Sequence, residues 1–400
     1  MPRSGSIRAF ALLTAIVAGL TSASFAFAQK QATSRNLLEN PGFERSLVGH
    51  EWLPTGWDTS QAGIPTVFFG RDSFLVRSGQ FVVNVANTST IFPMAHNWNQ
   101  TVPVGPESWG KVARFKVWTR NNGVQGRAYV MAQAYRDTLT LLSLNWKVTR
   151  DEVRKRLGIT KLDDPAMDLG WSRTQFDEAL TGWVQREAAV YIPPLTNVLF
   201  VRIGLLGTGQ LMADDASLTL ETAPALKRPQ VGANLLADAS FEEGSALRWE
   251  IAVPPYEGAR IDVDSTVART GRRSVRFSNM FDGLVQTRMG VCQPFGRELA
   301  GKRVRVSAWF KGDSLKGTAY VKVWAQAPRF GLEQSPGREM LSGTFDWQLL
   351  ESDFDVPHGT EILWAWFLIN APAEGTLWID DAKFEVLGDV APVKATPTGG

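Results

Sequence analysis

The residues best suited to chemistry in this sequence are tryptophans and tyrosines in three stretches of alternating apolar and polar residues. Residues 303–311, 318–326 and 362–370 alternate in this way, which indicates strands that bury one face in a core. The opposite face would carry five large aromatics: Trp309, Tyr320, Trp324, Trp364 and Trp366. With Lys322 beside them, such a face can stack on the apolar side of a sugar ring while polar groups bind its hydroxyls.

A second interpretation of these aromatics stays open. A helix, a loop or another domain could bury the same face, because tryptophan is highly buried on average. An exposed aromatic patch of this size would instead mark a binding surface. Truncating one tryptophan separates the two interpretations, since it would weaken ligand binding in one case and the fold in the other.

The strands that carry these aromatics belong to a repeated unit. Residues 36–44 (Asn-Leu-Leu-Glu-Asn-Pro-Gly-Phe-Glu) return as residues 234–242 (Asn-Leu-Leu-Ala-Asp-Ala-Ser-Phe-Glu), with five of the nine positions identical and an offset of 198 residues. Further pairs follow in the same order, among them Trp118 with Trp309. Such self-similarity indicates the duplication of a whole domain.

The repeat and the strand pattern together predict the fold class. Short runs rich in Val, Phe and Trp, separated by Gly, Pro, Asn and Asp, are typical of a β-sandwich. We therefore predict an all-β chain with two tandem β-sandwich domains, at residues 36–221 and 233–387. Residues 222–232 contain two prolines and are predicted to be a linker. Residues 388–400 are rich in Pro, Thr and Gly and are predicted to be a disordered tail.

One stretch of the first domain departs from the strand pattern. Residues 138–181 correspond to a shorter segment in the second copy, and we interpret them as an insertion between strands. Thr149 and Glu152 have the spacing of a helix capping box, which predicts a helix directly after Thr149. We expect another helical turn or two at residues 174–180.

The N-terminal segment and the charge balance limit the possible locations and partners. Arg3 and Arg8 precede an apolar stretch at residues 9–20, and small residues follow at 26–28. Residues 1–28 therefore predict a cleaved signal peptide and a secreted or periplasmic protein without membrane insertion. The sequence holds 42 Lys and Arg against 40 Asp and Glu, and two of the arginines lie in that segment. A chain with balanced charge and no run of basic residues lacks the positively charged surface that nucleic-acid binding requires.

The first copy repeats the aromatic face with fewer aromatic side chains. The corresponding positions are Trp118, Tyr129, Gln133, Tyr135 and Arg202. Gln133 takes the place of Trp324, and Arg202 takes the place of Trp366. Either the two copies bind different ligands, or the first copy has become a spacer.

The repeated motifs resemble those of a known group of modules. The opening Asn-Leu-Leu-x-x-x-x-Phe-Glu, the Val-x-Ala-Trp-Phe-Lys strand and the closing Ile-Asp-Asp-Ala-x-Phe are similar to motifs of CenC-type carbohydrate-binding modules of families 4, 9 and 22. The resemblance covers most of residues 36–221 and 234–387. It implies tandem β-jelly rolls of the galactose-binding-like class that bind a polysaccharide or glycan. The ligand stays open, because this fold hosts unrelated binders.

The same resemblance implies a structural calcium ion near the first and last strands of each copy. Carried over by motif, its ligands would be Glu44 with Asp215 and Glu242 with Asp381. Hard oxygen ligands suit calcium, although backbone carbonyls would have to complete each shell. The alternative is that these four carboxylates are solvated turn residues.

No catalytic motif stands out, so we expect a protein that is not an enzyme. His50, His96 and His358 are isolated in the sequence, and no zinc, nucleophile-elbow or phosphate-loop motif is present. Cys292 is the only cysteine, which we expect to be a small buried residue. Two functions stay open: an exported glycan-binding protein with two unequal modules, or an extracytoplasmic structural protein whose aromatic faces contact a protein partner at the cell envelope.

Overall fold

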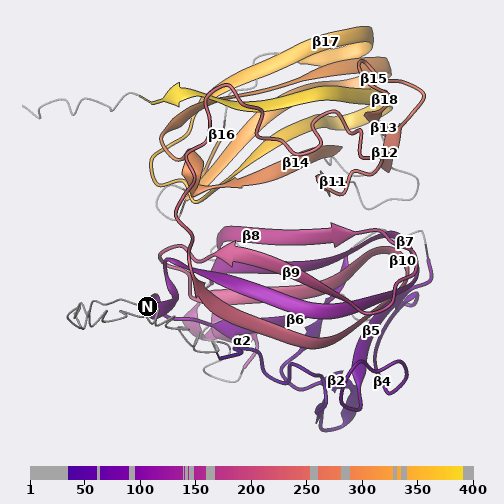
Figure 1. Ribbon diagram of the computed structural model, residues 1–400, viewed down its shortest axis with the longest axis vertical. Helices are drawn as coiled ribbons and strands as arrows, with labels where there is room; N and C mark the ends of the chain where they lie inside the picture. The colour runs from indigo at the N-terminus through magenta and orange to yellow at the C-terminus, as the bar shows by residue number, and fades with distance from the viewer. Residues whose placement is uncertain are drawn as a thin grey trace, which may run out of the picture. The chain divides into compact units, whose positions relative to one another are not determined.

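The computed structural model describes residues 35–60, 64–89, 95–137, 139, 143, 148–158, 167–252, 260–280, 289–327, 331–334 and 340–390. The predicted signal peptide at 1–28 and most of the predicted tail lie outside the described residues. The described residues form two successive β-sandwiches (Figure 1), so the predicted all-β tandem architecture is confirmed. Within these ranges, no helix is long and apolar enough to cross a membrane.

The two sandwiches contain corresponding sets of elements. The first contains β1 (Ser46–Leu47), β2 (His50–Pro54), β3 (Asp58–Thr59), β4 (Val67–Asp72), β5 (Val82–Asn87), β6 (His96–Pro103), η1 (Pro106–Ser108), β7 (Lys111–Arg136), α2 (Arg150–Leu157), β8 (Met167–Phe176), β9 (Val184–Tyr191) and β10 (Val198–Thr222). The second contains β11 (Glu250–Ala252), β12 (Arg260–Asp264), β13 (Ser274–Met280), β14 (Met289–Gly296), η3 (Arg297–Leu299), β15 (Lys302–Ala327), β16 (Gly331–Gln334), β17 (Leu341–Asp355) and β18 (Ile362–Asp389).

Two long antiparallel strands serve both sheets of each sandwich (Figure 1). In the second sandwich, the end of β15 and the start of β18 pair with each other and with β16, β14 and β11 in one sheet. The start of β15 and the end of β18 pair with β17, β13 and β12 in the other. In the first sandwich β7 and β10 play the same part, with β8, β6 and β3 in one sheet and β9, β5 and β4 in the other.

Glycines lie where the long strands pass from one sheet to the other. A Cβ atom on Gly207 would lie 2.1 Å from the carbonyl oxygen of Gln125, and one on Gly375 would lie 2.5 Å from that of Asp313. Both glycines have positive φ angles, of 141° and 88°, which residues with a Cβ atom rarely adopt. The strand registers shift at these points, so the backbone bends there and each strand joins two sheets.

The alternation predicted from the sequence decides which side chains form the cores. The inward side chains of β15 and β18 are buried in one cluster: Val304, Val306, Ala308, Phe310, Ala319, Val321, Val323, Ala325, Leu363, Ala365, Phe367 and Ile369. The first sandwich has an equivalent cluster around Phe115, Val130 and Val201. The predicted core faces of these strands are confirmed.

The repeated opening phrase fastens the chain to the last strand of each sandwich. The side-chain amide of Asn36 donates to the carbonyl oxygen of Ala216 at 3.0 Å, and its oxygen accepts the N–H of Leu218 at 2.9 Å. Asn234 makes the same two bonds to β18, at 2.9 and 3.0 Å. Asparagine serves here because one side chain can both donate and accept.

The helix of the first domain forms where its capping box predicts it. The Thr149 hydroxyl accepts the N–H of Glu152 at 3.2 Å at the start of α2. The helical turn expected at residues 174–180 is wrong, because β8 extends through Phe176 and pairs with β7. Pairing with a long neighbouring strand decides the conformation over local propensity. Since β8 pairs with β7 as β16 pairs with β15, the part of 138–181 from Met167 to Phe176 belongs to the sheet.

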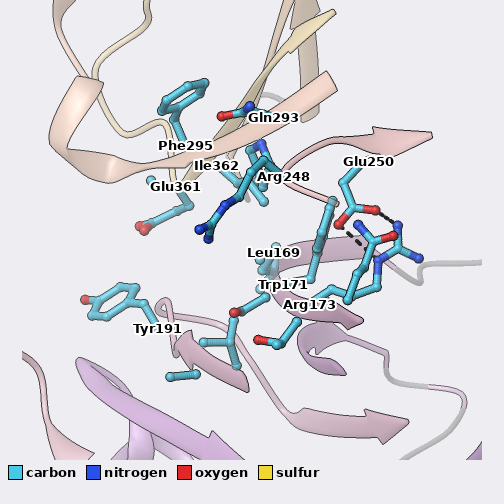
Figure 2. Close-up of a pocket in the computed structure, with 18 of the residues that line it drawn as sticks. Leu169, Trp171, Arg173, Tyr191, Arg248, Glu250, Gln293, Phe295, Glu361 and Ile362 are labelled. Atoms are coloured by element: carbon cyan, nitrogen blue, oxygen red, sulfur yellow. Dashed lines mark hydrogen bonds and ion pairs between the residues drawn. The ribbon is translucent and has the colours of Figure 1, made fainter. Parts of the chain in front are cut away.

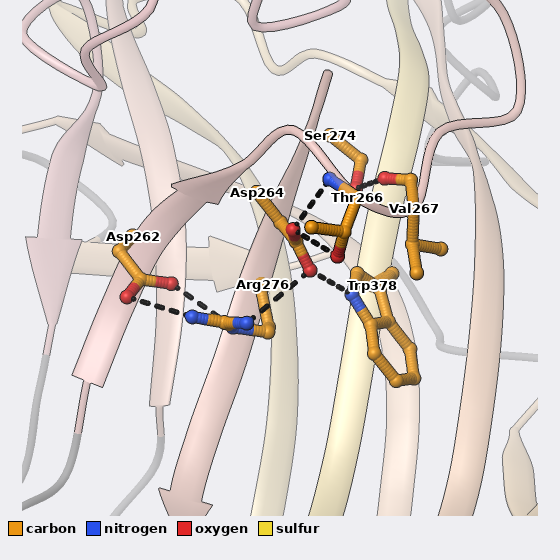
Figure 3. Close-up of polar contacts among 7 residues, drawn as sticks. All are labelled: Asp262, Asp264, Thr266, Val267, Ser274, Arg276 and Trp378. Carbon is orange, nitrogen blue, oxygen red and sulfur yellow. Dashed lines mark hydrogen bonds and ion pairs between the residues drawn. The ribbon is translucent and has the colours of Figure 1, made fainter. Parts of the chain in front are cut away.

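A polar network fastens the edge strand β12 of the second sandwich (Figure 3). Arg276 on β13 binds Asp262 at 3.2 Å and Asp264 at 3.3 Å. Asp264 also accepts the indole N–H of Trp378 at 2.8 Å and the hydroxyl of Thr266 at 2.7 Å. Burial works to raise the pKa of Asp264, but these bonds and Arg276 hold it below its ordinary value. The network is therefore a structural clamp.

The first sandwich carries a hairpin, formed by β1 and β2, between the opening phrase and β3. The side chain of Val48 at its tip is 97% exposed, and Phe74 in the nearby turn after β4 is 76% exposed. Large apolar residues at this end of the first sandwich therefore face solvent.

Candidate functional site

Three of the predicted tryptophans gather on the outward face of β15 and β18. The rings of Trp324 and Trp366 lie 5.2 Å apart at an angle of 47°. Both pack against a small buried cluster that contains Trp364, only 9% exposed. Trp171 from β8 of the first sandwich packs against the same cluster. Protein therefore covers part of this face, as in the second interpretation of the sequence.

Tyr320 and Lys322 lie beside these tryptophans on β15. The Tyr320 hydroxyl donates to the side-chain oxygen of Asn370 at 2.8 Å. The Lys322 ammonium lies 5.8 Å from the ring centre of Trp324 and 6.0 Å from that of Tyr320. The alternation thus places four of the five predicted aromatics, with the lysine, on one surface.

Trp309 does not lie with the other four, which corrects the predicted grouping. It belongs to the first half of β15, where the strand pairs with β17 and with the end of β18 in the other sheet. The guanidinium of Arg269 stacks over its ring at 3.7 Å. Trp118 in the first sandwich lies equivalently, under Arg77 at 4.0 Å. A bend leaves a side chain on the same side of its strand, but it changes the strands, and so the side chains, that lie beside it.

The remaining predicted residues of the first sandwich form a buried polar group. Gln133 donates to the hydroxyl of Tyr135 at 3.1 Å and, at 3.4 Å, to Asp168 of β8. Arg202 stacks over the neighbouring Phe200 ring at 4.5 Å. Burial raises the pKa of Asp168 to about 6, although hydrogen bonds from Gly170 and Gln133 work against the shift. Tyr129 on the same face accepts a bond of 3.1 Å from Asn97 and is buried.

A groove of about 740 Å³ lies beside the tryptophan cluster, between β8 and β9 on one side and β14 and the start of β18 on the other (Figure 2). The residues labelled in its lining are Leu169, Trp171, Arg173, Tyr191, Arg248, Glu250, Gln293, Phe295, Glu361 and Ile362. Its volume is in the range of small-molecule sites. Aromatic rings from both sandwiches stand here among amide, guanidinium and carboxylate groups, and we take this groove as the candidate site.

One end of the groove is closed by bonds between the two sandwiches (Figure 2). The guanidinium of Arg173 donates to the carboxylate of Glu250 at 3.0 Å. Gln175 and Arg127 both donate to the carbonyl oxygen of Trp249 at 3.1 Å. Because the Arg173–Glu250 pair is largely buried, removing one partner would leave an uncompensated charge.

The aromatic wall at Tyr191 is held by a cation. Arg297 donates to the Tyr191 hydroxyl, and its guanidinium lies 3.6 Å from the ring centre. Burial raises the pKa of Tyr191, with Arg297 opposing the shift. Opposite, Phe295 packs 4.7 Å from the core residue Phe384. Both rings are therefore fixed in place before any ligand binds.

The groove also contains carboxylates. The Glu361 side chain has one oxygen that is buried and makes no hydrogen bond within the described structure. Burial raises the pKa of Glu361, with Arg297 opposing the shift. Glu298 accepts the N–H of Gly296 at 2.9 Å. Sugar hydroxyls and ammonium groups are donors that such oxygens accept.

The two glutamates proposed as calcium ligands hold turns of the backbone. Glu242 accepts the N–H groups of Arg272 at 2.8 Å and Arg273 at 2.9 Å. Glu44 accepts the N–H of Gln80 at 3.0 Å in the first sandwich. A carboxylate that accepts N–H groups in this way completes a turn without a metal.

The two aspartates proposed as calcium ligands are paired with arginines in the same turns. Asp381 accepts from Arg269 and from the Thr270 hydroxyl, both at 2.6 Å, and Asp215 pairs with Arg77. Burial works to raise the pKa of Asp381, yet these donors hold it below its ordinary value. The described residues contain no group of three or more potential ligands that could hold a metal. Protein donors thus occupy the carboxylate oxygens that calcium would need, which favours the interpretation of these residues as turn residues; the calcium hypothesis itself is open to a melting experiment.

The sequence interpretation missed the aromatic residues of the groove. Trp171 lies in the stretch interpreted as an insertion, although Trp171, Arg173 and Gln175 alternate with smaller residues in the manner of a strand. Tyr191 and Phe295 lie at strand ends, where alternation gives little information. Cys292, by contrast, is buried as expected, beside Trp364.

No protein-family model and no curated protein matches this chain. Among solved structures, the tandem family 22 carbohydrate-binding modules of Paenibacillus barcinonensis Xyn10C are 15% identical, with 89% of this chain and 98% of that chain covered and a TM-score of 0.32. The C-terminal family 22 module of Clostridium thermocellum Xyn10B is 18% identical, with 40% and 96% covered and a TM-score of 0.32. The enzymatically active domain of tailspike protein 4 of bacteriophage CBA120 is 12% identical, with 38% and 21% covered and a TM-score of 0.32.

Carbohydrate-binding modules, including a tandem pair, are thus among the solved structures that this chain resembles. The identities and TM-scores are low.

Proposed function

We propose that this chain is an exported, non-catalytic glycan-binding protein that holds its ligand in the groove between the two sandwiches. The observation that carries the proposal is the combination of Trp171, Tyr191 and Phe295 with polar side chains in one groove. Aromatic rings supply surfaces for the apolar faces of sugars, and the polar groups supply hydrogen bonds that orient them.

The two modules contribute unequally in this proposal. The first sandwich supplies Trp171 and Tyr191, and the second supplies Phe295 and two of the carboxylates, Glu298 and Glu361. The tryptophan cluster of the second sandwich serves as packing between the modules, because Trp171 already lies against it. Export is proposed from the composition of residues 1–28.

Tyr191→Ala tests the proposed function. The change removes an aromatic wall of the groove without opening a core, because the Tyr191 side chain is only partly buried. Retention on polysaccharide gels or calorimetry with soluble polysaccharides should show affinity lower by tenfold or more, equivalent to about 1.4 kcal/mol. Trp52→Ala is the control, since this exposed tryptophan lies on β2 outside the groove lining and its loss should leave affinity unchanged.

A protein contact at the cell envelope is the second candidate function. The observation that favours it is the exposure of Val48 and Phe74 at one end of the first sandwich, since exposed apolar patches mark interaction sites. The two candidates separate in the Tyr191 experiment. If the parent protein binds no polysaccharide, the glycan proposal fails and the protein contact remains.

A further inference from the structure

The charged residues that line the groove do not balance. Two arginines and four glutamates line it: Arg173, Arg248, Glu243, Glu250, Glu298 and Glu361. Each arginine is engaged by one glutamate, Arg173 by Glu250 and Arg248 by Glu243, the latter at 3.1 Å. Within the part of the chain that the structure describes, Glu298 and Glu361 have no ion-pair partner within 4.0 Å. Even when Arg297 on the Tyr191 ring is counted, four glutamates face three arginines, so the groove has an excess of negative charge.

Glu361 is the carboxylate in the groove that can accept a hydrogen bond from a ligand. One of its oxygens is buried and makes no hydrogen bond within the described structure, and an unsatisfied buried acceptor costs free energy. The positive charge of Arg297 acts on the Glu361 carboxyl group, but Arg297 already donates to the Tyr191 hydroxyl. A ligand that brings its own donor would satisfy the Glu361 oxygen, whereas an anionic ligand would face two carboxylates at close range.

We propose that the groove selects glycans that present hydroxyl or ammonium donors and rejects those that carry carboxylates, with Glu361 as the residue that discriminates. This inference rests on the proposed function and adds the chemical class of the ligand. The hydroxyl and the ammonium are two sources of the same hydrogen-bond chemistry. A uronate chain offers similar rings to the aromatic walls, so it differs from a neutral chain chiefly in charge.

Calorimetry with three hexasaccharides tests the proposal, one built of β-1,4-linked glucose, one of β-1,4-linked glucosamine and one of galacturonic acid. The galacturonate hexamer should bind at least tenfold more weakly than the glucose hexamer at low salt. Added salt should reduce this difference, because it screens charge. A glucosamine hexamer that binds more tightly than glucose would identify an ammonium as the donor, and equal binding would identify a hydroxyl.

Glu361→Gln keeps the size of the side chain and removes its charge. This variant should lower the discrimination against galacturonate at least threefold. Glu51→Gln is the matched control, because Glu51 is exposed on β2 outside the groove lining and its replacement should leave the discrimination unchanged. Near-equal or tighter binding of galacturonate by the parent protein would overturn the charge inference while the glycan-binding function stands. If none of the three hexamers binds, the proposed function itself fails.

Discussion

At the scale of single residues, Asp168 shows how burial shapes this protein. Its carboxyl group lies beside Gln133 and Gly170, and burial outweighs their hydrogen bonds, so its pKa rises from 3.8 to about 6 in the folded state. The folded protein therefore binds a proton more tightly than the unfolded chain. Asp168 consequently destabilises the fold above pH 6, and this penalty disappears as the pH falls from 6 towards 3.8.

Asp168→Asn should remove that penalty. The shift of about two pKa units sets an upper limit near 3 kcal/mol, and we expect a gain in unfolding free energy of about 1–3 kcal/mol at pH 7.5, with almost none below pH 4. Urea unfolding at both pH values measures the difference. Asp313→Asn, at an exposed position in the bend of β15, is the control. An equal effect of Asp168→Asn at the two pH values would contradict the argument.

At the scale of elements, the turns that precede β5 and β13 are each held by a glutamate and an aspartate. Glu242 and Asp381 hold the turn at residues 269–273 through backbone N–H groups, Thr270 and Arg269. The first sandwich repeats the arrangement. The repeated acidic residues thus have a structural role that does not need an ion.

We expect the melting temperature to stay unchanged when calcium or a chelator is added. An ion that binds only the folded state stabilises it by about 2.7 kcal/mol at one hundred times its dissociation constant, and a calorimetric melt detects such a change easily. A rise in melting temperature with calcium would show that the ion displaces the arginines. Glu242→Gln then distinguishes the two roles, since it should abolish that rise.

The element scale also shows what a sequence can predict. Alternation indicated correctly which side of β15 and β18 enters the core, because the side-chain period of a strand is two residues. It grouped Trp309 with Trp364 incorrectly, because a bend between them moves the strand to another sheet without changing its faces. Gly312 and Gly317, which flank the bend, were visible in the sequence, but a glycine alone does not distinguish a bend from a turn.

At the scale of the whole molecule, the tryptophan cluster joins the two modules. Trp364 is almost fully buried, and Trp171 from the other sandwich packs against its cluster. No pattern within one domain could predict this contact, because the repeat predicts two similar sandwiches and says nothing about how they pack. The groove was missed for the same reason, since its aromatic residues come from both copies.

Trp364→Ala should therefore act on stability. Truncating a buried tryptophan costs about 3–5 kcal/mol, and denaturant unfolding should show a loss of this size. Trp309→Ala is the comparison, because that ring lies half-buried under Arg269 in the other sheet and its loss should cost about 1 kcal/mol. Equal losses for the two variants would contradict the assignment of Trp364 to a buried cluster that stabilises the fold.

The burial of Cys292 has a practical consequence for measurement. It is the only cysteine in the chain, its side chain is 1% exposed, and burial raises the pKa of its thiol. Because the thiolate is the reactive form, a maleimide dye should not reach it while the protein is folded. A cysteine introduced at the exposed Val48 would then take up the dye alone, so a fluorophore can be attached at one chosen position in the native background. Slow labelling of Cys292 itself would report separation of the two modules, because Cys292 belongs to the cluster that joins them.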